Sequence, residues 1–260
     1  MSKNPNWSRE EHILAFKLYN EIPFGQIDED TPQIQALAKL IGRTPGAVSY
    51  KLANFSRMDP VLQARGIKGM SHGAKGEAQI WAEFAYHPEA LALESELLLA
   101  QRLGKTLEEV AEIETYDLPK EGIERDAVVK IRVNQSFFRR RILSAYDFRC
   151  CVTGLATRSL LNASHIVSWA ENKQNRLNPR NGLCLNALHD RAFDRHLMWI
   201  DGGALIRFSP QLQKVTETTK EAVSWLTQFE GRPLLLPKKF SPDPEFLKLH
   251  AARCAAKIIL

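Results

Sequence analysis

Apolar residues recur with helical spacing over most of the first hundred positions. Ser8 followed by Glu11 has the pattern of a capping box, and Thr31-Pro32 and Thr44-Pro45 each place a capping residue before a proline that suits the first helical turn. The predicted helices cover roughly residues 8–21, 32–41, 46–55, 77–86 and 89–103. The N-terminal part of the chain is therefore predicted to be all helical.

A short turn at Gly42 joins the second and third of these helices. The segment IQALAKLIGRTPGAVSYKLANF resembles DNA-binding helix-turn-helix and winged-helix domains, whose second helix enters the major groove. The helical spacing turns Lys51 and Asn54 toward solvent or DNA. By this resemblance the DNA contacts come from Arg43, Thr44, Ser49, Tyr50 and Lys51. A plain helical hairpin uses the same turn, and the acidic residues 28–30 favour that alternative.

Two segments lack helical spacing and separate the helical parts of the chain. Residues 57–76 are rich in glycine and basic residues, which predicts a wing or an ordinary connecting loop. A charged segment with Asp117-Leu118-Pro119 is the best linker. We therefore predict a helical DNA-recognition domain over residues 1–115, a linker over 116–128 and a second domain over 129–260.

The second domain opens with a basic amphipathic segment. Arg139, Arg140 and Arg141 lie beside apolar residues at helical spacing, so the arginines could rest on DNA phosphates or simply be solvated. Further along, alternation over 197–209 around Gly-Gly predicts a hairpin, and residues 217–229 and 245–259 are predicted to be helical.

Charge is distributed unevenly along the chain. Residues 1–129 contain 14 lysines and arginines against 20 acidic residues, whereas residues 130–260 contain 21 against 10. A basic C-terminal half indicates a polyanionic partner. No apolar run is long enough to span a membrane, and MSKNPNWSREEH has no signal-peptide core, so we expect a cytoplasmic protein. Without a secretory signal we expect the four cysteines to be reduced thiols, and because they form no C-x-x-C pairs we expect no structural zinc.

Two histidines and an asparagine follow in order within one segment. His165 lies in ASHIVSW, Asn181 in NPRNGLCL and His189 in ALHDRAFD. Phosphodiester cleavage needs a base to take a proton from water, and a neutral imidazole can do this at physiological pH. A divalent ion can stabilise the charge that develops on the phosphate, and an asparagine amide can brace a loop. These three residue types therefore suit metal-assisted cleavage of nucleic acid.

Five motifs in register, RVNQSFFRRRIL, YDFRCCVTG, ASHIVSW, NPRNGLCL and HDRAFD, resemble the restriction-endonuclease branch of the HNH endonucleases over about residues 128–202. The resemblance implies a ββα-metal domain, and thus an α+β protein with a helical N-terminal domain. It implies that His165 is the general base, Asn181 the brace of the loop, and His189 a ligand of Mg²⁺ or Mn²⁺. Ser164 departs from the family, because many members carry a metal-binding Asp or His there, and Asp194, Asp190 or water would have to complete the metal shell.

The predicted function is a metal-dependent DNA endonuclease. Its predicted role is restriction of foreign DNA, with cleavage that either does or does not depend on modified bases. Each chain carries one site, so double-strand cleavage of DNA would need a homodimer or two successive nicks. Two alternatives stay open at this point. Ser164 favours a catalytically inactive DNA-binding regulator, and a broad-specificity toxin or effector nuclease would use the helical domain to bind a partner protein.

Overall fold

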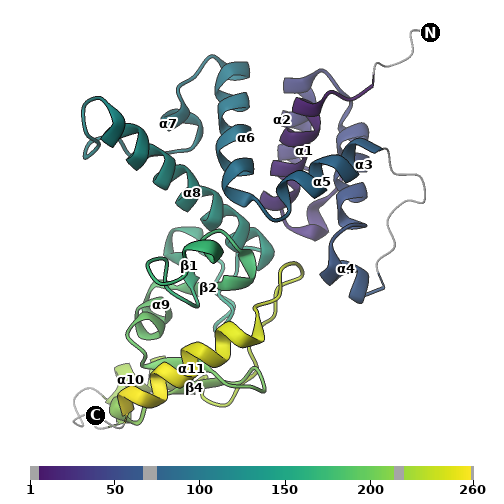
Figure 1. Ribbon diagram of the computed structural model, residues 1–260. Helices are drawn as coiled ribbons and strands as arrows, with labels where there is room; N and C mark the ends of the chain where they lie inside the picture. The colour runs from purple at the N-terminus through teal and green to yellow at the C-terminus, as the bar shows by residue number, and fades with distance from the viewer. Residues whose placement is uncertain (1–5, 67–74, 214–219, 259–260) are drawn as a thin grey trace. The chain divides into compact units, whose positions relative to one another are not determined.

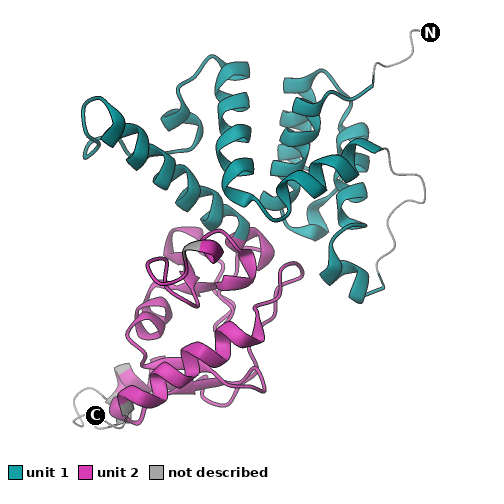
Figure 2. Cartoon of the chain, viewed as in Figure 1, with its two compact units in different colours: residues 1–141 teal, residues 142–260 magenta. Residues whose placement is uncertain are grey.

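The computed structural model describes residues 6–66, 75–213 and 220–258, and the chain forms two compact units, residues 1–141 and 142–260 (Figures 1 and 2). The described residues of the first unit are all helical or irregular, whereas the second unit combines helices with two small sheets. The α+β class predicted from the sequence agrees with this composition. No helix in the described part of the chain has the length and apolar character of a membrane span.

The helices of the first unit are α1 (Arg9–Glu21), α2 (Pro32–Ile41), α3 (Pro45–Ser56), α4 (Pro60–Ala64), α5 (Lys75–Phe84), α6 (Pro88–Leu103), α7 (Leu107–Val110) and most of α8 (Ile123–Ala145). A short 3-10 turn, Phe24–Gln26, follows α1. Helices α2, α3, α5 and α6 all contact α1.

The capping box predicted before α1 is confirmed. The Ser8 hydroxyl accepts from the Glu11 N–H at 3.2 Å, and the Glu11 carboxylate accepts from the Ser8 N–H at 2.7 Å, which satisfies two orphan donors of the helix. Beyond the cap, α1 buries Phe16 and Tyr19 against Phe55 of α3, with 4.8 Å between the Phe16 and Phe55 ring centroids. Buried aromatic rings of this kind contribute a large apolar area to the core of the unit, beside the aliphatic side chains of the same helices.

The helix, turn and helix predicted around Gly42 are present. Gly42 ends α2 in the left-handed conformation, with φ at 68°, and the Thr44 hydroxyl caps α3 by accepting from the Ala47 N–H. The segment predicted as a loop or wing differs from expectation, because α4 occupies part of it. Asp59 begins α4 by accepting from the Val61 N–H at 2.9 Å. Residues 67–74 of that segment lie outside the described residues.

The expectation that Lys51 and Asn54 face solvent is wrong. Both side chains donate to the Glu77 carboxylate of α5, at 2.7 Å and 3.0 Å, and all three residues are buried. Helix α5 packs against this face of α3 and covers it. The sequence pattern of α3 alone could not show this, because Glu77 lies 26 residues beyond Lys51.

Helix α8 crosses the boundary between the two compact units. All but its last four residues belong to the first unit. Within that unit the Arg132 guanidinium donates to the Glu114 carbonyl, and the Ser136 hydroxyl donates to the Ala111 carbonyl at 3.0 Å. The predicted linker over 116–128 includes the residues just before α8 and the first turns of α8 itself, which begins at Ile123. The compact units divide later, after Arg141.

The second unit contains β1 (Leu161–His165), β2 (Gly182–Asn186), α9 (Ala187–Asp194), β3 (Met198–Ile200), β4 (Ile206–Phe208), α10 (Lys220–Thr227) and α11 (Pro244–Ile258). Short 3-10 turns lie at Arg158–Leu160, Lys173–Asn175, Pro179–Asn181 and Pro210–Gln213. Strands β1 and β2 pair antiparallel, and α9 follows β2 directly and packs on both strands. This is the order of two strands and a helix that the resemblance implies.

The remainder of the second unit packs around this motif. Strands β3 and β4 form the hairpin predicted over 197–209, with Met198 opposite Phe208, and α11 packs on β3. The predicted helices over 217–229 and 245–259 correspond to α10 and α11, apart from 217–219 and 259, which lie outside the described residues. Cys150, Cys151, Cys184 and Cys254 are buried free thiols.

We expect Glu77→Gln to lower the free energy of unfolding by about 3 kcal/mol at neutral pH, because the substitution leaves the buried Lys51 cation without its counter-charge. Burial alone would raise the pKa of Glu77, but hydrogen bonds from His12, Lys51 and Asn54 hold it at about 2. The stabilisation is therefore complete above about pH 4.5 and is lost as the pH falls toward 2. Urea unfolding at several pH values measures this. The exposed Glu121→Gln is the control, and equal stability of the two variants would contradict the prediction.

Candidate active site

His165 and Asn181 meet where β1 ends and β2 begins. His165 is the last residue of β1 and pairs with Gly182, the first residue of β2. Asn181 immediately precedes Gly182, and its carbonyl accepts from the Ile166 N–H at 3.0 Å. Strand pairing thus brings together two residues that are 16 positions apart in the sequence.

The His165 ring has a defined tautomer. Its Nε2 lies 2.8 Å from the Arg176 carbonyl oxygen, which can only accept, so Nε2 carries the proton and the lone pair of the neutral ring is on Nδ1. Burial lowers the pKa of His165 below its usual value, although the Arg176 carbonyl opposes this shift. The Trp169 ring lies edge-on to the imidazole, with 5.5 Å between centroids. At neutral pH His165 is therefore a neutral imidazole with a basic Nδ1.

The Asn181 side chain ties down the loop that follows β1. Its Oδ1 accepts from the Val167 N–H at 2.8 Å, and its Nδ2 donates to the carbonyls of Val167, at 3.0 Å, and Asn175, at 3.2 Å. The side chain is fully buried, so each of these bonds replaces one that water would otherwise make. The amide therefore holds the loop at Val167 and at Asn175, close to Trp169 and Arg176, which contact His165.

His189 lies in the first turn of α9 with both ring nitrogens close to protein oxygens. Nδ1 is 3.1 Å from the Asn186 side-chain oxygen, and Nε2 is 3.2 Å from the Leu226 carbonyl. The ring is fully buried, and burial lowers its pKa. Aromatic side chains surround it, namely Phe208, Trp225 and Phe229. A neutral imidazole can donate to only one of these two oxygens, so the other nitrogen keeps its lone pair, but the oxygen beside it lies where a metal ion would bind.

The two carboxylates of α9 lie one turn apart on a different face from His189. The Asp190 carboxylate accepts from the Asn162 side chain at 2.7 Å, which directs it toward β1. Asp194 is exposed at the surface of α9, but neighbouring atoms partly desolvate its carboxylate, and this effect, followed by the charge of Asp190, raises its pKa. Ser164 lies on the same face of β1 as Asn162, and its hydroxyl is buried without a hydrogen-bond partner among the described residues.

Of the two residues proposed as metal ligands, His189 does not fit a metal ion in this arrangement. It belongs to the same helix as Asp194, but each of its ring nitrogens has a protein oxygen within 3.2 Å. Within residues 6–66, 75–213 and 220–258, no group of three His, Cys, Asp or Glu side chains is arranged to hold a metal. Any divalent ion would have to rely on carboxylate oxygens of α9, water and the DNA phosphate.

The residues proposed to contact DNA in the first unit differ in their surroundings. The Arg43 guanidinium pairs with Glu11 at 2.8 Å and lies over the Trp7 ring, while Lys51 is held by Glu77. Thr44 caps α3. These three side chains therefore have structural partners within the unit. Of the remaining two, Tyr50 is exposed and Ser49 is half-buried.

The three arginines of α8 also differ in their surroundings. Arg139 is exposed. Arg140 pairs with Glu21 at 2.9 Å and with Glu96, and Arg141 is buried, which lowers its pKa to about 10. Of the three, Arg139 is the arginine that can reach DNA phosphate without breaking contacts within its own unit.

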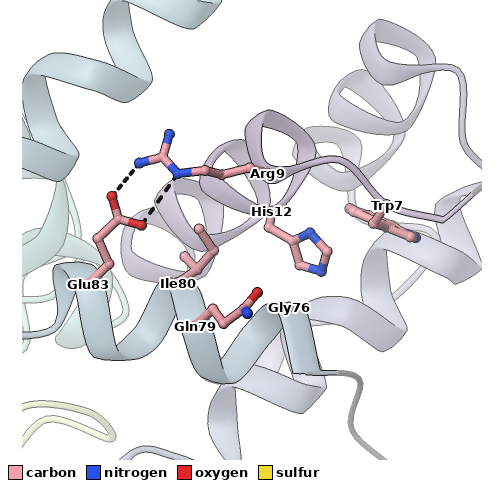
Figure 3. Close-up of a pocket in the computed structure, with 7 residues that line it drawn as sticks. All are labelled: Trp7, Arg9, His12, Gly76, Gln79, Ile80 and Glu83. Atoms are coloured by element: carbon pink, nitrogen blue, oxygen red, sulfur yellow. Dashed lines mark hydrogen bonds and ion pairs between the residues drawn. The ribbon is translucent and has the colours of Figure 1, made fainter.

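The first unit also contains a pocket of about 300 Å³ between α1 and α5 (Figure 3). It is lined by Trp7, Arg9, His12, Gly76, Gln79, Ile80 and Glu83. The Arg9 and Glu83 side chains form an ion pair at one end, and His12 lies over Gly76 (Figure 3). A Cβ at Gly76 would lie 2.6 Å from the His12 ring, so only glycine permits this approach of α5 to α1.

Two residues that shape the site, Asn186 and Arg176, were not predicted from the sequence. Asn186 caps α9 by accepting from the Leu188 and His189 N–H groups, and an asparagine directly before a predicted helix is a recognisable capping signal. Arg176 fixes the His165 tautomer through its backbone carbonyl, and Trp169 contacts both residues. No sequence signal marks Arg176, because the group that acts is a carbonyl oxygen that every residue possesses.

The family comparison covers the residues that build this site. The sequence model of the HNH endonuclease family matches residues 150–201, which include β1, β2 and α9. The match supports an HNH endonuclease domain over these residues, and such a domain suggests a nuclease that acts on DNA. No curated protein matches the sequence.

We expect Asn181→Asp to lower the free energy of unfolding by roughly 2–4 kcal/mol, because a buried carboxylate would face the carbonyls of Val167 and Asn175 that the amide now serves. Thermal unfolding measures the loss, and hydrogen exchange should locate it in residues 167–176. Asn172→Asp is a control in the same segment, because its Oδ1 accepts the Asn175 N–H at 3.2 Å and the Asn175 side-chain amide at 3.1 Å, as a carboxylate can. A loss of the same size in both variants would show that Asn181 has no special structural role.

Proposed function

We propose that this protein is a metal-dependent endonuclease that hydrolyses phosphodiester bonds in DNA, with His165 as its general base. The observation that carries the proposal is the hydrogen bond from His165 Nε2 to the Arg176 carbonyl, because it leaves the lone pair on Nδ1. The lowered pKa keeps the ring unprotonated at neutral pH, as a base requires. The HNH family match over these residues supports the same assignment.

The proposed reaction uses one water molecule for each phosphodiester bond. His165 Nδ1 takes a proton from the water, the resulting hydroxide attacks phosphorus, and the bond from phosphorus to the 3′ oxygen breaks. The 3′ oxygen gains a proton from solvent, and the imidazolium then releases its own, which returns the neutral base. The products are a 5′-phosphate and a 3′-hydroxyl.

The family implies a divalent ion, which would neutralise charge on the phosphate and the leaving oxygen. Because His189 does not fit as a ligand here, we derive no step through the metal. Of the residues proposed from the sequence, Asp194 supports a metal role better, because carboxylate oxygens suit Mg²⁺ and the side chain is exposed.

We infer that restriction of foreign DNA is the biological role and that the helical unit contributes to the choice of DNA. The helix pair α2–α3, with its exposed Tyr50, and the exposed Arg139 of α8 support a DNA contact by that unit. Recognition of a modified base is a further part of the proposal. Cleavage of modified and unmodified plasmid by the same preparation tests it directly.

We expect plasmid cleavage with Mg²⁺ or Mn²⁺ to fall by a factor of about 10²–10⁴ in His165→Ala, since a positioned base contributes that much. His196→Ala is the control, because His196 lies outside the β1–β2 site. The wild-type rate should fall on acidification with a midpoint below pH 6.5, because a base works only when unprotonated and the pKa of His165 is lowered from 6.5. Equal rates for the two variants would remove His165 from the mechanism.

The metal proposal has its own test. We expect chelation to abolish cleavage and Asp194→Asn to raise the Mg²⁺ concentration for half-maximal rate about tenfold, a change typical of weakened metal binding. Glu245→Gln, an exposed carboxylate on α11, is the control. His189→Ala should chiefly lower the melting temperature, because the ring is buried. An unchanged Mg²⁺ requirement in Asp194→Asn, with a raised requirement in a stably folded His189→Ala, would return the ligand role to His189.

The second candidate function is a DNA-binding regulator that has lost catalysis. Ser164 favours it, because the hydroxyl is buried and is a poor substitute for the acidic or histidine ligand of many family members. DNA binding without cleavage on any plasmid, with Mg²⁺ or Mn²⁺, would support the regulator and reject the nuclease.

A further inference from the structure

His165, Trp169 and Arg176 each contact the other two. The Arg176 carbonyl binds the imidazole Nε2 at 2.8 Å, and the Arg176 side chain turns back so that its Nε donates to the Trp169 carbonyl at 2.8 Å. The guanidinium carbon lies 5.1 Å from the centre of the Trp169 ring, within range of a cation–π contact. The Trp169 ring meets the imidazole edge-on, with an angle of 88° between the two rings.

The position of the Arg176 carbonyl depends on this arrangement. Arg176 lies in an irregular segment between the 3-10 turn at Lys173–Asn175 and the one at Pro179–Asn181, so no ladder of backbone bonds holds it. Its side chain binds backward to Trp169, and the preceding carbonyl, that of Asn175, accepts from Asn181. The side chains of Arg176 and Asn181 thus hold the backbone at the Arg176 carbonyl in place.

We propose that Arg176 and Trp169 are positioning residues, which hold His165 in the Nε2-protonated tautomer, so that the lone pair of the base is on Nδ1. The inference rests on the proposed function of His165 as the base. If the carbonyl moved, the imidazole could place its proton on Nδ1, and that ring would offer no lone pair to the water. Residues that orient a metal ligand through a hydrogen bond are typically worth 10–100-fold in activity, and we expect an effect of the same size for residues that orient a base.

Charge alone does not explain the role of Arg176. Lysine at this position would keep the positive charge and could still meet a DNA phosphate. It would lose the planar guanidinium that both donates to the Trp169 carbonyl and stacks on its ring. Arg176→Lys therefore separates positioning of His165 from attraction of DNA.

Arg180 offers a matched control in the same loop. It lies four residues further on, is exposed, and pairs with Asp243 at 3.3 Å. Its carbonyl accepts the N–H of Asp243 at 2.9 Å. Arg180→Lys makes the same chemical change close to the site without touching the contacts of His165.

The experiment measures cleavage kinetics and the histidine tautomer in the full-length wild type, Arg176→Lys, Trp169→Phe and Arg180→Lys. We expect Arg176→Lys to reduce kcat 10–100-fold with little change in KM. Long-range nitrogen–proton NMR spectra should show one Nε2-protonated tautomer for His165 in the wild type and a mixture in Arg176→Lys. Trp169→Phe, which keeps an aromatic ring, should retain most of the activity and a single tautomer.

The outcomes separate this inference from the proposed function. A single His165 tautomer and an unchanged kcat in Arg176→Lys, as in Arg180→Lys, would overturn the positioning role. If the wild type cleaves no DNA, the proposed function fails, and the NMR comparison still decides whether Arg176 sets the tautomer. A variant with a lowered melting temperature is judged at a temperature where its spectrum is that of a folded protein.

Discussion

The buried amide of Asn181 is the interaction on which the HNH site depends. A connection of 16 residues between two short strands has few backbone bonds of its own, and its polar groups must still be satisfied once water is excluded. The Asn181 side chain, directly before β2, both accepts from the N–H of Val167 and donates to its carbonyl, as a neighbouring strand would. The ring of His165 and the carbonyl that fixes it therefore have a defined separation before any substrate arrives.

The parts of the fold that could be predicted are those encoded by neighbouring residues. The cap formed by Ser8 and Glu11, the turn at Gly42 and the hairpin around Gly202-Gly203 are local patterns, and each is confirmed. Helix α4 was missed because a five-residue helix has almost no periodicity, although Asp59-Pro60 is a usable starting signal. The helix depends on the Asp59 cap, which is a local sequence signal even where no apolar periodicity follows.

The site shows the same division between local and distant determinants. The motifs find β1, β2 and α9, and the strand register brings His165 next to Asn181. They do not determine which way the His189 ring turns, because its Nε2 lies against the carbonyl of Leu226, 37 residues later in α10. Nor do they reveal that Lys51 is buried, since its partner belongs to another helix. Side-chain orientation is set by tertiary packing, which a linear pattern does not contain.

The internal ion pairs of the first unit have a consequence for how the protein responds to salt. That unit contains 19 lysines and arginines against 20 acidic residues, whereas the second contains 16 against 10. Cations such as Arg43, Lys51 and Arg140 are already neutralised by carboxylates of their own unit. Cations of this kind displace few condensed counterions from a duplex. The entropy of counterion release, and with it the ionic-strength dependence of DNA affinity, should therefore arise mainly from the unit that carries the nuclease site.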